Sequence, residues 1–194
     1  MSRQAKPTNP STKTLWSILC KALTLRENLY EDALSTPKAR RRALTIVVLA
    51  ALSHALGGTV ILLFGRAPLW FIFLAFFINA ASVIAGYYFW TFTILKLGKW
   101  MKKRALSYDD LLTPIGFAYA PQILNVLTLI PLLGRPIQLI LAAWSWLAVT
   151  IAVRESLNIS TPPAALICLI GWPLIQFLIG SLQVLEQSWV QVLR

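Results

Sequence analysis

The amino-acid sequence predicts an all-α fold: a polytopic membrane helical bundle of about five transmembrane helices, preceded by an N-terminal interfacial amphipathic helix. Hydrophobic residues make up 57% of the 194 residues and charged residues only 13%, and the mean hydropathy is +0.67. Soluble domains carry about 25% charged residues. Five apolar stretches are each close to the ~20 residues that cross a bilayer core. Basic residues cluster before the first stretch and between the second and third.

Residues 1–36 form a polar, basic leader without the apolar segment of a cleavable signal peptide, so we expect it to stay attached. On a helical wheel, residues 15–30 gather one narrow polar stripe opposite a wide apolar face. The stripe consists of Ser17, Lys21, Thr24 and Asn28. This pattern predicts a helix that lies on the headgroups or packs against the bundle, with the Arg26 stem snorkelling. Thr36 as N-cap and Pro37 at the first helical position then begin the next helix.

The membrane domain is expected over residues 37–186, followed by a short tail at 187–194. Its apolar stretches are Ala43 to Phe64, Pro68 to Leu95, Leu111 to Leu133, Ile137 to Val153 and Pro163 to Val184. Lipid offers the backbone no hydrogen-bond partners, so each stretch should be a helix. The third contains Pro114, Pro121 and Pro131 and should be kinked. The fourth is short, and a four-span alternative would fuse or lose one of these two.

The distribution of Lys and Arg predicts the orientation of the chain. Five spans place fifteen of the 18 basic residues on one side and leave only Arg66, Arg135 and Arg194 on the other. The positive-inside rule then puts the N-terminus in the cytoplasm and the C-terminus outside. Four spans would put the C-terminus inside with little charge bias. The net charge of +11 is mostly this orientation signal, and without a basic domain or base-stacking platform we expect no nucleic-acid partner.

Basic clusters next to the membrane ends are candidate contacts for lipid headgroups, where each residue gains about 1 kcal/mol. The candidates are Arg40, Arg41, Arg42, Lys102, Lys103 and Arg104. The chain has two cysteines, Cys20 and Cys168, which do not support a disulfide framework.

Chemistry-bearing residues are sparse within the spans. His54 is the only histidine of the chain, and the spans contain no carboxylate, which disfavours a proton-coupled transporter. Ser53 adjoins His54, but neighbours on a helix point about 100° apart and do not form a catalytic dyad. A zinc-protease motif, an intramembrane aspartate pair and a phosphate-binding loop are all missing from the sequence. We therefore predict no catalytic residue, no cofactor and no metal site.

Small residues one turn apart allow helix backbones to approach closely and predict the seams of the bundle. The pairs are Ala51 with Ala55, Ala81 with Ala85, Ser82 with Gly86, and Gly116 with Ala120. Trp70 and Trp90 are twenty residues apart, about 30 Å along a helix. This spacing predicts that both lie in the aromatic belts at the membrane interfaces.

The third stretch carries a family resemblance. Residues 112–124, which contain Gly-Phe-Ala-Tyr-Ala-Pro from Gly116 to Pro121, resemble the Yip domain family of Ypt/Rab-interacting membrane proteins. Leu129-Ile130-Pro131 and the run from Ile151 to Leu157 are similar as well. Tyr30-Glu31-Asp32, shortly before the basic residues at 40–42, resembles the entry to the domain in bacterial members.

The resemblance implies a five-pass membrane protein with a cytoplasmic N-terminus. Eukaryotic relatives bind prenylated small GTPases and organise early secretory membranes. This chain lacks the long cytoplasmic region with an Asp-Leu-x-Gly-Pro segment that marks those relatives, so we do not expect it to bind a small GTPase. Its short leader resembles the bacterial branch, which favours a bacterial inner membrane over Golgi or endoplasmic reticulum.

These observations favour a non-enzymatic membrane scaffold or adaptor whose partners are membrane lipids and other membrane proteins or a second copy. One alternative is a passive small-solute permease or channel lined by carbonyls that Pro121 frees between Phe117 and Asn125. Another is an accessory subunit of a larger membrane complex. The candidate functional residues are Gly116, Tyr119, Pro121, Asn125 and His54. The same residues can be interpreted as hinge and packing positions.

Overall fold

A computed structural model describes residues 15–24, 37–64, 68–101, 107–130 and 133–170 of the chain, and these residues are helical with no strand. In chain order the helices are α1 (Leu15–Leu23), α3 (Pro37–Phe64), α4 (Leu69–Met101), α5 (Tyr108–Ala118), the 3-10 helix η3 (Ala120–Leu129), α6 (Gly134–Leu157) and a short helix Thr161–Ile170. The predicted all-α class is therefore confirmed over the described part of the chain.

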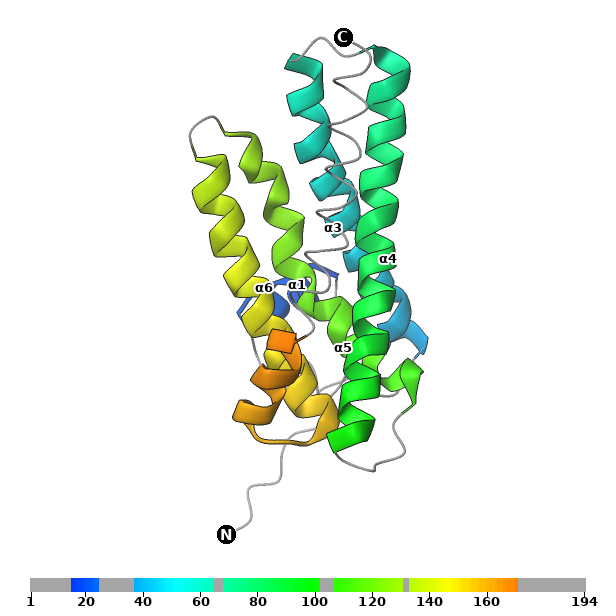
Figure 1. The fold of residues 1–194 in the computed structure, drawn as a ribbon, viewed down its shortest axis with the longest axis vertical. Coiled ribbons are helices and arrows are strands. Elements are labelled where there is room, and N and C mark those ends of the chain that lie inside the picture. Colours follow the sequence, from blue (N-terminus) through cyan, green and yellow to red (C-terminus); the bar gives the residue numbers. More distant parts are fainter. Residues whose placement is uncertain (1–14, 25–36, 65–67, 102–106, 131–132, 171–194) are drawn as a thin grey trace.

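The helices run alternately up and down. α3 and α4 form one antiparallel pair, α5 continues into η3, and α6 returns beside η3 (Figure 1). Three helical segments are long and apolar enough to cross a membrane, namely Pro37–Val60, Leu69–Trp100 and Pro136–Leu157. The predicted third span is divided between α5 and η3, and the predicted fifth is described only as far as Ile170. The count of five spans stays a prediction.

Two helices extend beyond the predicted apolar stretches at their basic ends. α3 begins at Pro37, the expected first helical position, rather than at Ala43, and α4 continues past Leu95 to Met101. Lysine and arginine are good helix formers, and their long stems keep the charge in water while the backbone stays helical. Hydrophobicity alone therefore placed these two boundaries too far inside the helices.

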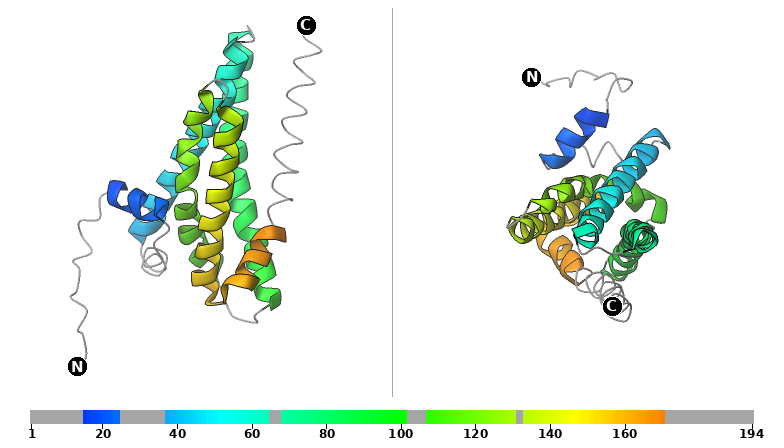
Figure 2. Two further views of the ribbon diagram at one scale, coloured as in Figure 1. Left: turned by 90° about the vertical axis from the view of Figure 1, so that its left-hand side faces the viewer. Right: turned by 90° about the horizontal axis from the view of Figure 1, so that it is seen from above.

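α1 lies crosswise on the side of the bundle, as Figure 2 shows. It packs against α5 and η3 and buries Ile18 and Ala22, one turn apart on the same face. This agrees with the alternative in which the N-terminal helix packs against the bundle. The second half of the predicted amphipathic helix, residues 25–30, lies outside the described residues, as does Thr36.

Small residues set the closest helix approach. A Cβ added to Gly116 of α5 would lie 2.9 Å from the Cβ of Ala43 in α3, so the two backbones meet there. Ala51 and Ala55 of α3 are also fully buried, as predicted for a seam. Ala81, in contrast, is exposed on α4, so its pair with Ala85 does not form a seam within the described part of the bundle. Sequence spacing identifies a small pair but does not say which neighbour, protein or lipid, it faces.

The tryptophans of α4 differ from each other in environment. Trp70 is 59% exposed near the start of the helix, as an interfacial anchor should be. Trp90 is only 4% exposed and packs edge-on against Tyr119, with 6.5 Å between ring centroids. Its predicted place in an aromatic belt is therefore wrong. Trp100, at the end of the longer helix, is 85% exposed instead.

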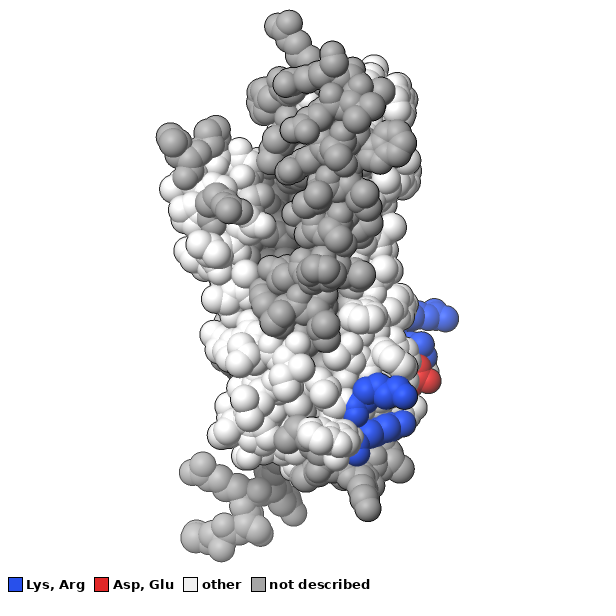
Figure 3. Space-filling model, viewed as in Figure 1, with Lys and Arg blue, Asp and Glu red and all other residues white. Residues whose placement is uncertain are grey.

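Charged residues gather at one end of the bundle. The start of α3, the end of α4, the start of α5 and the end of α6 all lie in the lower half of the bundle as drawn in Figure 1. Their basic residues are Lys38, Arg40, Arg41, Arg42, Lys96, Lys99 and Arg154. Figure 3 shows a group of these side chains on one flank, whereas the rest of the described surface in that view is uncharged. At the opposite end the described residues include one basic residue, Arg135 at the start of α6.

A tight turn ends α6 at the charged end. Asn158 has a left-handed conformation with φ of 49°, and the Ile159 N–H donates to the Arg154 carbonyl at 3.2 Å. Asparagine tolerates this conformation better than most residues. The Arg154 guanidinium pairs with Glu155 at 2.7 Å and also reaches the Thr161 hydroxyl at 3.5 Å, which links α6 to the helix that follows.

The contact between Gly116 and Ala43 can be tested by substitution. Gly116→Ala should lower the free energy of unfolding in detergent micelles by about 1–3 kcal/mol, because the α3 backbone must move away. Gly86→Ala in α4 is the matched control, since nothing lies within 4 Å of a Cβ added there. The control should be neutral or slightly stabilising, because alanine favours the helix by up to about 1 kcal/mol. Equal losses in the two variants would contradict a close approach at Gly116.

Candidate functional site

The predicted third span, which the structure divides into α5 and η3, changes helix type at Tyr119. α5 begins after Ser107, whose backbone N–H donates to Asp110 Oδ2 at 3.2 Å, and it continues as an α-helix to Ala118. Pro121 then occupies the first turn of η3 and has no N–H to donate to the preceding turn. The chain continues with tighter bonds, such as that from Gln122 N–H to the Tyr119 carbonyl at 2.9 Å. The break predicted from the prolines is therefore present.

The 3-10 geometry places residues three apart directly above one another. Gln122, Asn125 and Thr128 have this spacing and form a ladder along η3. Asn125 Nδ2 donates to Gln122 Oε1, and Thr128 Oγ1 donates to the Asn125 carbonyl at 2.6 Å. In an α-helix the first and third of these side chains would point about 120° apart. The change of helix type thus brings three polar side chains onto one line.

Two neighbouring helices contribute hydroxyl groups to this ladder. Ser145 of α6 accepts from Gln122 Nε2 at 2.8 Å. Ser53 of α3 donates to the Ile123 carbonyl at 2.6 Å and accepts from the Val126 N–H at 2.8 Å. These two backbone groups are three residues apart, the separation that a 3-10 hydrogen bond joins, so the serine hydroxyl bridges one rung of the helix.

We call Ser53, Gln122, Asn125, Thr128 and Ser145 the polar seam. Ser53, Asn125 and Ser145 are each less than 10% exposed. α3 approaches η3 closely beside the seam, because a Cβ on Gly57 would lie 3.2 Å from Thr128 Oγ1. Hydrogen bonds between membrane helices contribute about 0.6 kcal/mol each on average. The seam therefore joins α3, η3 and α6 through neutral groups.

An aromatic cluster holds α4 against α5 just before the break. The Tyr87 hydroxyl donates to the Leu112 carbonyl at 2.6 Å. The Tyr87 and Tyr119 rings meet edge to face, with centroids 5.6 Å apart, and the Trp90 ring also meets Tyr119 edge-on. Edge-to-face pairs add about 0.5–1.5 kcal/mol beyond burial. Tyr119 is thus a packing residue at the junction of α5 and η3.

The structure brings together some of the predicted site residues and separates others. Asn125 lies in the polar seam and Pro121 begins η3, while Gly116 packs against α3 one turn earlier. His54 is half-buried on a different face of α3 from Ser53. Gly58, one turn beyond His54, faces Asn79 of α4. No described residue forms a hydrogen bond with the His54 side chain.

The sequence singles out Asn125 as a candidate residue but does not place Gln122, Ser53 or Ser145 beside it. In the sequence Ser53 suggests only a candidate nucleophile, whereas its hydroxyl is engaged with the η3 backbone. The available signal was the spacing of polar residues three and six positions apart directly after a proline. That spacing is meaningful only if a 3-10 helix follows the proline.

The described residues contain no group of three or more His, Cys, Asp or Glu side chains that could hold a metal ion. Of the predicted headgroup contacts, Arg40 pairs with Asp109 at 3.0 Å and Arg41 is exposed. Arg42 is half-buried. The remaining three, Lys102, Lys103 and Arg104, lie outside the described residues.

The role of Ser53 in the polar seam can be measured. Ser53→Ala should lower the free energy of unfolding by about 1–2 kcal/mol and speed amide exchange at Val126, because the bridging hydroxyl is lost. Ser82→Ala is the matched control, since its hydroxyl donates only within α4, to the Ile78 carbonyl at 2.7 Å. The control should change stability by less than about 0.5 kcal/mol. A bridging role is excluded if exchange at Val126 is unchanged.

Comparison with known protein families gives a match to the Yip1 domain over residues 28–182. No curated protein and no solved structure matches the chain. The matched range includes the whole of α3, α4, α5, η3 and α6, and with them the polar seam and the aromatic cluster. It also includes the three helical segments that are long and apolar enough to cross a membrane. The chain is therefore an integral membrane protein that belongs to the Yip1 domain family.

Proposed function

We propose that this protein is a non-enzymatic membrane scaffold or adaptor of the Yip domain type. The observation that carries the proposal is the use of polar groups within the described spans. Ser53, Gln122, Asn125 and Ser145 bond to one another or to the η3 backbone, so they hold helices together. The described residues 43–64, 69–95, 111–130 and 136–153 include no Asp, Glu, Lys or Arg. A bundle whose polar groups around η3 hold neighbouring helices together suits a structural role.

The outward face of α4 supports binding of another membrane protein. Only 17% of its apolar window is buried, compared with 44% for the window in α3 and 39% for that in α6. Ala81 and Ala85 are exposed one turn apart on this face, and Phe77 beside them is 67% exposed. Small residues let a second helix approach closely in lipid. We infer that a transmembrane helix of a partner packs here.

The permease alternative needs carbonyls near Pro121 that face water. The structure instead engages one of them, the Ile123 carbonyl, with the Ser53 hydroxyl, and Phe117 is 2% exposed. These contacts favour the scaffold. An accessory subunit of a larger complex would use the same α4 face, and stable copurification at a fixed ratio would distinguish it from an adaptor with exchanging clients.

Photocrosslinking in native membranes tests the scaffold proposal. Tyr119 is buried and is a poor probe position, whereas Phe77 on α4 and Leu139 on α6 are 67% and 71% exposed. A photoreactive residue at 77 should capture one membrane protein at a constant ratio, and one at 139 should capture mainly lipid. Purified protein in liposomes should show no solute flux. Flux that is lost in Asn125→Ala or His54→Ala would overturn the scaffold and support a permease.

We also propose that the charged end of the bundle and the N-terminus face the cytoplasm, as the concentration of basic residues there favours. Cys20 is exposed on α1 and Cys168 is buried, so a maleimide reagent should label the two native thiols under different conditions. A membrane-impermeant maleimide should label Cys20 only after cells are permeabilised, and Cys168 only after denaturation. Cys20→Ser should abolish the labelling that is seen after permeabilisation. Labelling of Cys20 in intact cells would reverse the orientation.

A further inference from the structure

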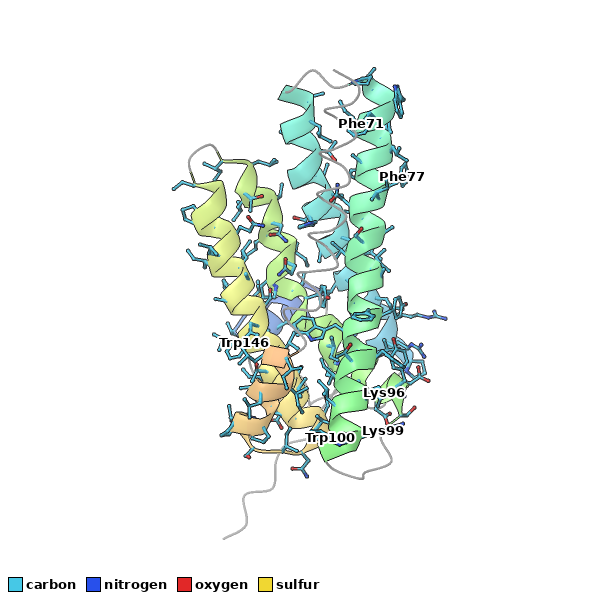
Figure 4. The ribbon with its side chains drawn as sticks, in the orientation of Figure 1. Phe71, Phe77, Lys96, Lys99, Trp100 and Trp146 are labelled. Carbon is cyan, nitrogen blue, oxygen red and sulfur yellow. The ribbon has the colours of Figure 1, made fainter. Side chains whose placement is uncertain are left out.

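One face of α4 changes from aromatic to cationic at its basic end. Phe89 and Phe92 are 41% and 48% exposed, and Lys96 and Lys99 follow at one-turn spacing. Trp100, 85% exposed, completes this face. Figure 4 shows Lys96, Lys99 and Trp100 together at this end of the helix. Along this face, aromatic side chains are followed by cationic ones, just as acyl chains are followed by headgroups in one bilayer leaflet.

The orientation of these residues follows from the packing of α4. Gly98 faces the bundle, because a Cβ added there would lie 2.9 Å from Leu157 of α6. Lys96 and Trp100 are each two residues from Gly98, which places them about 160° away around the helix. They therefore point away from the protein and toward the surrounding membrane.

Lys96 is also held at a defined depth. Its ammonium group lies over the Phe92 ring, 5.4 Å from the ring centroid. A cation over an aromatic face at this distance gains an electrostatic attraction while keeping its other side open. The arrangement fixes a positive charge directly above the last exposed phenylalanine of the face.

The nearby carboxylates leave this charge available. Asp109 pairs with Arg40 at 3.0 Å, next to the start of α5. Lys96 and Lys99 form no ion pair with any carboxylate among the described residues. Figure 3 shows the basic side chains of this flank with only a small acidic area among them.

We propose that Lys96, Lys99 and Trp100 form a binding site for an anionic phospholipid. The two ammonium groups bind the phosphate, Trp100 lies at the headgroup level, and the acyl chains lie along Phe89 and Phe92. The occupant must combine a negative headgroup with apolar chains, because the cationic and aromatic parts of the face are continuous. This inference depends on membrane residence and stands whether or not the protein is a scaffold.

The test uses the full chain reconstituted in vesicles of phosphatidylcholine and phosphatidylglycerol, the same in both leaflets. The protein is extracted, and the ratio of the two lipids that copurify is measured by mass spectrometry. The wild-type chain should be enriched in phosphatidylglycerol, and higher salt should reduce the enrichment. Lys96→Gln should lower it roughly fivefold, as expected for the loss of one basic contact at an anionic surface. Lys99→Gln should act in the same direction.

Two controls separate a site from a general charge effect. Arg135→Gln removes one charge at the opposite end of the bundle and should leave the enrichment unchanged. Lys96→Arg keeps the charge and should retain most of the phosphatidylglycerol enrichment. Helix content by circular dichroism must match the wild type, with Lys99→Gln used alone if Lys96→Gln does not fold. Equal enrichment in wild type and both glutamine variants, or an equal loss in Arg135→Gln, would overturn the proposal.

Discussion

The structure depends on one constraint: a backbone inside lipid must satisfy its own hydrogen bonds. Pro121 violates that constraint locally, because it removes a donor in the middle of the predicted third span. The chain responds by tightening into a 3-10 helix, and a hydroxyl from α3 bridges one of the new rungs. Ser53 therefore links the repair of the broken helix to the packing of α3. The position of α6 follows in turn, because Gln122 reaches Ser145 from the same helix.

α3 and α4, the two longest helices, pack against the segment formed by α5 and η3 by different means. α3 approaches it through small residues, Gly57 and Ala43 among them, where backbone contact replaces side-chain contact. α4 is attached through large aromatic side chains and the hydrogen bond from Tyr87 to Leu112. Only 17% of the apolar window of α4 is buried, so most of the surface of this helix lies outside the bundle. The same helix can therefore be part of the fold and the surface that meets the membrane environment.

Local features of the sequence predicted local features of the structure. The break near Pro121 and the start of α3 at Pro37 follow from proline chemistry, which needs no tertiary information. The close approach at Gly116 follows from side-chain size. Which helix lies opposite a small or aromatic residue was less predictable, as Ala81 and Trp90 show. In lipid both the outside and the inside of a bundle are apolar, so the hydrophobic pattern does not separate them.

The polar seam shows why the candidate site was only half predicted. Asn125 was recognisable as a polar group in an apolar stretch, but its alignment with Gln122 and Thr128 depends on the helix type. The pairing of Gln122 with Ser145 depends further on how α6 is rotated against η3. The helix type after Pro121 and the rotation of α6 against η3 cannot be read from the residue spacing of η3 or of α6 alone. Both are consequences of tertiary packing around the break.

The 3-10 helix has one more consequence, for the thickness of membrane that the predicted third span would cover. A 3-10 helix rises about 2.0 Å per residue and an α-helix about 1.5 Å. The 10 residues of η3 therefore reach about 5 Å further than they would as an α-helix. An unbroken α-helix would need about three more residues to end at the same depth. The proline thus sets the hydrophobic length of this segment, the quantity a bilayer must match.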